Sequence, residues 1–180
     1  MRFTRFNIIG TSGSGKSTFS RKLAEILSLP YVELDQVFWQ PNWKHLSDEE
    51  LFRQVNKITE KDSWVLDGNY SRTTAIKWAR VECVVWLDHS FGVTVYRALK
   101  RAINRAATKR ELWPGTGNTE SFRVSFFSKD SVILWTLQNY YKNKKKYSLA
   151  MNDERYRGIK FVRLCSQADA NDFISDLNRK

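Results

Sequence analysis

The chain has 180 residues, a net charge of +11 and a sequence pI near 9.8. This length predicts one domain, and 42% hydrophobic residues with only 3 prolines exclude a disordered or collagen-like chain. The cysteines, Cys83 and Cys165, are too few for a disulfide framework or a four-cysteine zinc site. Both stand in apolar runs, so we expect two buried strand thiols.

The basic excess indicates an anionic partner, such as nucleotide phosphates, nucleic acid or a membrane surface. No apolar run reaches the roughly 18 residues that a membrane span needs. Residues 1–10 have the pattern of a strand rather than of a signal peptide. We therefore expect a cytoplasmic protein without a membrane partner.

Apolar runs and helical periods alternate along the chain. Strands are predicted over 3–9, 31–34, 63–66, 83–87 and 160–164. Ser47 and Glu50 have the spacing of a capping box. Between the strands, helix faces are indicated by Phe19, Leu23, Ile26 and Leu27, by Leu51, Val55 and Ile58, by Val95, Leu99, Ala102, Ile103 and Ala106, and by Ile133, Leu137, Tyr140 and Tyr141. A last helix is predicted from Ser166 onward. Strands separated by helices predict an α/β fold, a parallel sheet with helices on both faces.

The segment from residue 10 to residue 17 matches the phosphate-binding pattern G-x-x-x-x-G-K-[ST] in full, between a predicted strand and a predicted helix. Glycines let the backbone N–H groups point at phosphate oxygens, and the helix N-terminus adds positive potential. Lys16 is expected to reach the β- and γ-phosphates of ATP, and Ser17 to bind Mg²⁺. The predicted nucleotide-binding residues are Gly10, Thr11, Ser12, Gly13, Ser14, Gly15, Lys16, Ser17 and Thr18.

Two further motifs narrow the class of P-loop protein. The segment Asp67-Gly68-Asn69-Tyr70 looks like the D-G segment that ends a strand in adenylate kinases. Arg101 and Arg105 have the R-x-x-x-R spacing found where the lid of such kinases begins. The chain therefore resembles the adenylate-kinase-like P-loop kinases. With Glu33-Leu34-Asp35 and the tryptophans near residue 40, it is most similar to bacterial proteins named DNA topology modulation proteins, which are themselves kinase-like.

This resemblance implies a single three-layer P-loop NTPase domain with a five-stranded parallel sheet in the order 2-3-1-4-5. It also implies an acceptor-side insert at 36–62 and a lid loop at 107–127. Within the lid, residues 111–127 contain Pro114, Gly115 and Gly117 and no helical period, so we expect a mobile loop. The segment at 33–35 departs from adenylate kinases and is closer to the D-x-D region of shikimate- and gluconate-type kinases.

Two aspartates compete for the Mg²⁺-binding role at a strand end. Asp67 agrees with both the P-loop and the D-G motif, and with Ser17 it is the predicted metal site. Asp88 ends the fourth predicted strand and is the rival, although a helix N-cap is the simpler interpretation for it.

Asp35 follows the second predicted strand, at the edge where open α/β sheets bind ligands. It is the predicted catalytic carboxylate, which would accept a proton from an acceptor hydroxyl. Phe38, Trp39 and Trp43 follow it, either as an aromatic wall for a base or ring or as packing for the insert.

Arginines at intervals of four lie on one predicted helix face, and mutual repulsion there would be relieved by a phosphate. Arg101 and Arg105 are the predicted catalytic lid residues. Arg97 shares their face, Arg110 and Arg123 are weaker lid candidates, and Arg72 is a candidate acceptor-side contact.

The predicted function is Mg²⁺-dependent transfer of the ATP γ-phosphate to a small acceptor, by Lys16, Asp35, Asp67, Arg101 and Arg105. A nucleoside monophosphate needs arginines at the acceptor site, whereas a hydroxyl acceptor benefits from a base, and the chain offers both. The alternative is a nucleotide-regulated DNA-binding protein, suggested by the charge and by the run Lys142, Lys144, Lys145 and Lys146.

Overall fold

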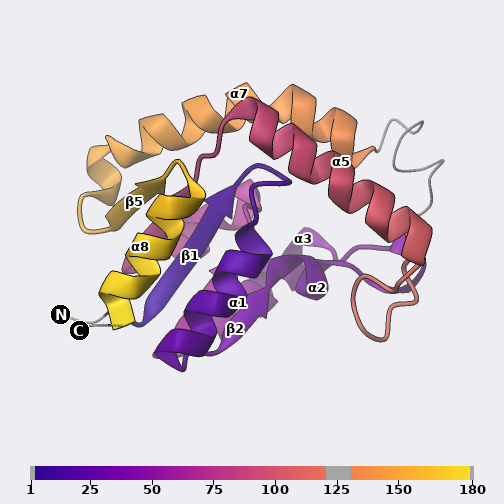
Figure 1. Ribbon diagram of the computed structural model, residues 1–180. Coiled ribbons are helices and arrows are strands. Elements are labelled where there is room, and N and C mark those ends of the chain that lie inside the picture. The colour runs from indigo at the N-terminus through magenta and orange to yellow at the C-terminus, as the bar shows by residue number, and fades with distance from the viewer. Residues whose placement is uncertain (1–2, 121–130, 179–180) are drawn as a thin grey trace.

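In the computed structural model, which describes residues 3–120 and 131–178, five parallel strands form one sheet in the order β2-β3-β1-β4-β5 (Figure 1). Both the fold class and the strand order agree with the sequence prediction. The P-loop strand lies at the centre, between β3 and β4. The strands are β1 (Arg5–Gly10), β2 (Tyr31–Glu33), β3 (Trp64–Asp67), β4 (Cys83–Leu87) and β5 (Lys160–Leu164).

The helices of the described residues cover both faces of the sheet. They are α1 (Lys16–Leu27), α2 (Leu34–Phe38), α3 (Asp48–Thr59), α4 (Thr74–Trp78), α5 (Phe91–Thr108), α7 (Val132–Met151) and α8 (Gln167–Asn178). In Figure 1, α1 and α8 lie together in front of the sheet, and α5 and α7 pass across one end of it. Short 3-10 turns occupy Pro41–Trp43, Ser71–Thr73 and Glu154–Tyr156.

Alternation of side chains along the strands produces two separate cores. Phe6 and Ile8 of β1 pack against α1 and α8, whereas the intervening Ile9 packs on the opposite face. The same alternation in β4 puts Val85 in the first core and Trp86 in the second, beside Tyr147 of α7. The sheet is therefore buried on both sides, as a doubly covered parallel sheet requires.

Two short helices were absent from the sequence prediction. β2 ends at Glu33, and Leu34 starts α2 instead of completing the strand. α4 occupies residues that showed no helical period. Each is only 5 residues long, too short for a repeating apolar face to reveal it.

The buried faces of the two long helices were predicted only in part: Ala102, Ala106 and Tyr140 are buried as expected, and other members are not. α5 buries Thr94, Ala98, Ala102 and Ala106, and Ile103 is 49% exposed. Small residues are needed there because α5 lies directly on the P-loop: a Cβ at Gly13 would be 2.5 Å from the Thr94 carbonyl oxygen. α7 buries Thr136, Tyr140 and Tyr147, whereas Leu137 and Tyr141 are exposed.

Of the other local predictions, some are confirmed and one is wrong. The Ser47 hydroxyl accepts a hydrogen bond from the Glu50 N–H at 3.2 Å, so the predicted cap is confirmed. Cys83 is buried, but Cys165 is exposed, because β5 ends one residue earlier and Cys165 belongs to the loop before α8. No helix in the described ranges is long and apolar enough to cross a membrane.

The described part of the predicted lid loop is folded rather than irregular. Glu111 and Thr119 form an antiparallel bridge, and the Leu112 N–H donates to the Asn118 carbonyl at 2.9 Å. The Glu111 carboxylate accepts from the Gly117 N–H at 2.6 Å. Residues 121–127 of the predicted lid, including Arg123, lie outside the described residues.

Candidate nucleotide and acceptor site

The P-loop connects β1 to α1 through glycines in conformations that other residues rarely adopt. Gly10, Gly13 and Gly15 have φ of 151°, 85° and 88°. A Cβ at Gly10 would be 2.7 Å from the Leu87 carbonyl oxygen, so glycine is required there for space as well. Gly15 caps α1 without any side-chain hydrogen bond, and no acidic residue stands in the first turn. The helix N-terminus therefore presents its N–H groups without a competing acceptor of its own.

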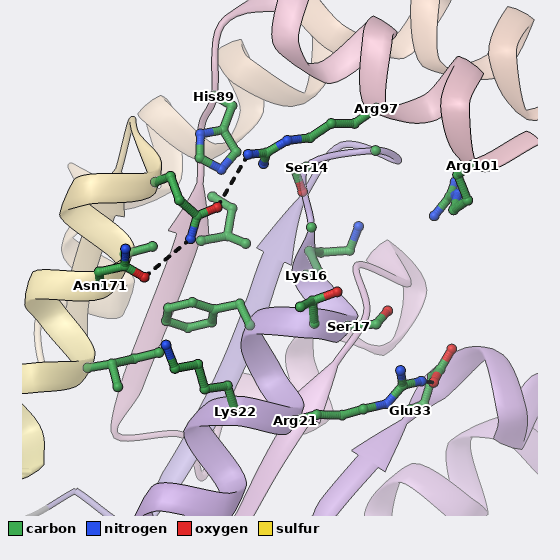
Figure 2. Close-up of a pocket in the computed structure, with 18 of the residues that line it drawn as sticks. Ser14, Lys16, Ser17, Arg21, Lys22, Glu33, His89, Arg97, Arg101 and Asn171 are labelled. Atoms are coloured by element: carbon green, nitrogen blue, oxygen red, sulfur yellow. Dashed lines mark hydrogen bonds and ion pairs between the residues drawn. The ribbon is translucent and has the colours of Figure 1, made fainter. Parts of the chain in front are cut away.

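A pocket of about 540 Å³ opens beside this loop (Figure 2). Its walls come from Gly13–Thr18, from α5 and from the start of α8; Gly10, Thr11 and Ser12 do not line it. Figure 2 shows Ser14, Lys16, Arg97 and Arg101 around the same hollow. The Lys16 ammonium donates to the Thr11 carbonyl at 3.3 Å. Burial lowers the pKa of Lys16, while the nearby carboxylates of Asp67 and Asp35 act in the opposite direction.

Asp67 has the properties expected of a Mg²⁺-binding aspartate. It ends β3 with 3% of its surface exposed, and its Oδ1 atom has no hydrogen-bond partner within the described residues. Burial raises the pKa of this carboxyl, and Lys16 and the Ser17 hydroxyl lower it. An unpartnered carboxylate oxygen next to a hydroxyl is a donor set that suits a hard cation retaining several waters. Asp67 and Ser17 therefore fit Mg²⁺.

Asp88 serves neither of the roles expected for it. Its carboxylate accepts two hydrogen bonds from Arg163, at 2.8 and 2.5 Å, and lies 3.4 Å from the Lys144 ammonium. Ser90, not Asp88, is the N-cap of α5. Because its charge is already neutralised by two cations, Asp88 is a structural ion-pair residue, and Asp67 is the better candidate for the metal.

The arginines of α5 do line the nucleotide pocket. Arg101 is half-buried, and it donates to the Ser12 hydroxyl; burial, then Arg105, lowers its pKa. Arg105 pairs with the buried Glu120 at 3.0 Å, and Arg97 donates to the Gln167 side chain at 3.3 Å. Each of the three arginines therefore has a protein partner, and a bound phosphate would either take the place of that partner or accept an additional hydrogen bond.

Asp35 lies in the first turn of α2 rather than directly after a strand. Its carboxylate is exposed and accepts a hydrogen bond from the Tyr70 hydroxyl at 2.7 Å. Burial, then Asp35, raises the pKa of Tyr70, so this hydroxyl stays a donor. The charge of Asp35 also opposes the lowering of the Lys16 pKa by burial, which places the acceptor-side carboxylate within electrostatic reach of the P-loop.

The predicted aromatic wall joins the insert to the lid loop. Phe38 and Trp39 are in edge contact at 5.0 Å, and Trp39 stacks on Trp113 at 6.1 Å with an interplanar angle of 16°. Trp43 meets Trp113 edge-on at 6.0 Å. The Asn118 side chain, 2% exposed, completes the join by accepting from the Trp43 N–H at 3.0 Å and donating to the Gln40 carbonyl. These rings therefore pack the insert against the lid.

The remaining basic candidates are mostly engaged elsewhere. Arg72 pairs with Asp48 at 2.6 Å and lies over the Phe38 ring. Arg110 is exposed and does not line the pocket. Within the lysine run of α7, Lys144 pairs with Asp88 and Lys146 donates to the Ser71 hydroxyl.

Sequence reasoning missed several residues that shape this site. Asn69 enters the sequence prediction only as part of a motif, yet its side chain makes two hydrogen bonds to the Gly10 backbone, one to the N–H and one to the carbonyl. The buried Lys77 gave no signal, because it belongs to the short α4. Trp113 and Asn118 could be found only once the lid and the insert were placed together.

Comparisons with known proteins define the fold of this chain. No protein-family model matches, and no curated protein matches. Among solved structures, the chain is similar to shikimate kinase from Bacteroides thetaiotaomicron, with 12% identity, a TM-score of 0.60 and coverage of 98% of this chain and 97% of that one. It is also similar to a gluconokinase from Sinorhizobium meliloti 1021, with 17% identity, a TM-score of 0.52 and coverage of 99% and 96%.

A third similar structure is shikimate kinase from Acinetobacter baumannii in complex with shikimate, with 14% identity, a TM-score of 0.59 and coverage of 97% and 90%. These identities are low, and the likeness extends over nearly the whole of each chain. The chain therefore has the P-loop kinase fold that small-molecule kinases share.

Proposed function

We propose that this protein is an ATP-dependent phosphotransferase that acts on a small acceptor. The observation that carries the proposal is the arrangement around Lys16. A complete P-loop lies beside a pocket large enough for a nucleotide; Arg101 contacts its Ser12 hydroxyl, and the buried Asp67 has a carboxylate oxygen without a hydrogen-bond partner among the described residues. The similarity in fold to shikimate kinase and gluconokinase supports this reaction class.

Each group of the site has a distinct task in such a transfer. The P-loop N–H groups and the α1 N-terminus bind the phosphates, and Lys16 stabilises the negative charge that develops on the transferred group. Ser17 and Asp67 would hold Mg²⁺, which neutralises phosphate charge when it is bound. Arg101 and Arg105, at the pocket wall, would turn from Ser12 and Glu120 to the phosphates and exclude water.

The acceptor side favours a hydroxyl compound over a nucleoside monophosphate. An exposed Asp35 carboxylate would repel a phosphate but can accept a proton from a hydroxyl group. Arg72, the arginine that a monophosphate would need, is paired with Asp48. We therefore assign Asp35 as the general base. Kinship with the DNA topology modulation proteins stays a prediction from the sequence motifs.

A DNA-binding function has less support. Two of the four lysines in the run on α7, Lys144 and Lys146, have partners in the protein, which weakens the case for a continuous basic patch. The net charge of +11 alone does not choose between nucleic acid and nucleotide phosphates.

A coupled ADP-release assay over nucleotides, nucleosides, sugars and polyols tests the proposal. We expect ADP formation to depend on a hydroxyl-bearing acceptor, and a variant with Asp67→Asn to lose it. ATP turnover that no acceptor stimulates would contradict a phosphotransferase. DNA binding that weakens steeply with salt, without ADP release, would favour the alternative.

A further inference from the structure

Lys77 of α4 is an unusual residue, because its side chain is buried and no carboxylate among the described residues is hydrogen-bonded to it. It is 1% exposed, and its ammonium donates to the carbonyl oxygens of Gly68 and Asn69, at 3.2 and 2.7 Å. Burial lowers the pKa of Lys77 to about 7, with a further contribution from Lys146. Burying a charged ammonium costs free energy unless hydrogen bonds compensate it. The two carbonyl oxygens that accept from Lys77 therefore indicate which part of the backbone this side chain stabilises.

Those two carbonyls belong to the turn that follows β3. Gly68 has φ of 140°, and a Cβ there would be 2.9 Å from the Leu34 Cβ atom. Tyr70, two residues on, has φ of 25°. Such a backbone is held only where the surrounding structure determines it. The Gly68 carbonyl accepts a second hydrogen bond, from the Asn7 side chain, whereas the Asn69 carbonyl accepts from Lys77.

The same turn contacts both the P-loop and the acceptor-side carboxylate, Asp35. The Asn69 side chain donates to the Gly10 carbonyl at 2.8 Å and accepts from the Gly10 N–H at 3.1 Å. It therefore holds both backbone polar groups of Gly10, the first residue of the P-loop, in hydrogen bonds. The next residue, Tyr70, donates to Asp35 at 2.7 Å. One buried ammonium thus underlies contacts to the nucleotide loop and to the acceptor-side carboxylate.

We propose that Lys77 is a positioning residue: by fixing the carbonyls of Gly68 and Asn69, it aligns Asn69 with the P-loop and Tyr70 with Asp35. Its part on the acceptor side rests on the function proposed above for Asp35. Its part at Gly10 does not, because the Asn69 contacts involve only the protein itself. The charged groups facing Lys77 within the described residues are Lys146 of α7 and Asp67 of β3.

Amide hydrogen exchange at Gly10, measured by NMR without nucleotide, is the direct test. Lys77→Met keeps the length and volume of the side chain but removes the donor. We expect exchange at Gly10 to become at least tenfold faster, although Lys77 does not contact that residue. Lys57→Met, at an exposed position on α3, is the matched control and should leave Gly10 unchanged. Asn69→Ala, which removes the two hydrogen bonds to Gly10, should reproduce the effect.

Titration calorimetry with Mg-ADP gives the functional arm. We expect Lys77→Met to weaken binding at least fivefold at pH 6, and the ratio to wild type to move toward 1 by pH 9. The reason is that a charge-assisted hydrogen bond is about twice as strong as a neutral one, and the wild-type amine loses its charge over this range. A purely structural role would leave that ratio independent of pH.

Equal Gly10 exchange in wild type and Lys77→Met would overturn the proposal, as would faster exchange with unchanged Mg-ADP affinity. If Lys77→Met does not fold, the wild type supplies the test. Its Gly10 protection, corrected for the intrinsic rate, should fall between pH 6 and pH 9, and a constant value would overturn the proposal. Should wild type fail to bind Mg-ADP, the phosphotransferase proposal fails, while the exchange result still decides the role of Lys77.

Discussion

The Lys16 ammonium rests on the Thr11 carbonyl, a weak partner that a phosphate oxygen can replace. Replacing Lys16 with alanine should therefore weaken Mg-ATP binding at least tenfold or abolish turnover, because the charge nearest the transferred group is lost. Calorimetry with Mg-ATP measures this, and Lys57→Ala on the exposed surface of α3 is the control. Wild-type affinity and turnover in Lys16→Ala would remove the P-loop from the mechanism.

Asp35 and Tyr70 form the polar contact of the acceptor side. As a general base, Asp35 should contribute about 10²–10⁴-fold to the rate, so Asp35→Asn is expected to lower kcat by that factor with Mg-ATP affinity nearly unchanged. Steady-state kinetics with the acceptor found in the screen measure the effect. A loss confined to KM would mean that Asp35 orients the acceptor, and unchanged kinetics would exclude it from the site.

At the scale of elements, the insert and the described part of the lid are held together by hydrogen bonds and by packed aromatic rings. Asn118 holds both the Trp43 N–H and the Gln40 carbonyl, and the stacked tryptophans lie beside it. Asn118→Ala should therefore speed amide exchange at 40–44 and 111–119 at least tenfold, because buried partners are left unpaired. Exchange that is fast in wild type and unchanged in the variant would show that this join does not persist in solution.

How far the sequence predicts these elements depends on length and on tertiary context. The P-loop and the strand ends around Asp67 were placed correctly, since a strict motif and a buried apolar run each determine local structure. α2 and α4 escaped prediction because five residues carry no period. The face of α5 was predicted only in part, because close approach to Gly13 selects small side chains, which hydrophobicity does not reveal.

The candidate site was predictable in part for the same reasons. Lys16, Ser17 and Asp67 are defined by motifs with a known chemistry, whereas Lys77 and Asn118 act through contacts between distant segments. Both Asp67 and Asp88 end a predicted strand; the motifs favour Asp67, and the partners Arg163 and Lys144 show why Asp88 is the weaker metal candidate. Charge in three dimensions, rather than residue type, distinguishes a structural carboxylate from a metal-binding one.

At the scale of the whole molecule, Lys77 should make stability depend on pH. Burial lowers its pKa to about 7, against 10.5 for an ordinary lysine, so between these values the unfolded chain binds a proton that the folded chain lacks. Stability should therefore rise with pH across this window, by up to about 1.4 kcal/mol per pH unit. Below pH 7 both states are protonated, and the contribution is constant.

Urea unfolding at pH 7 and pH 9 measures this dependence. The wild type should gain about 2 kcal/mol more than Lys77→Met between these values, the variant cancelling the contributions of other titrating groups. Equal gains in the two proteins would show that the Lys77 amine is not desolvated in the folded state.

The central claim is the transfer of a phosphoryl group to a small acceptor, and ³¹P NMR of the product mixture tests it most directly. With the acceptor from the screen, Mg²⁺ and ATP, we predict one phosphorylated acceptor for each ADP formed, with little inorganic phosphate. Lys16→Ala should form neither product. ADP accompanied by an equal amount of inorganic phosphate, with every acceptor unmodified, would contradict the account and identify the chain as a nucleotide hydrolase.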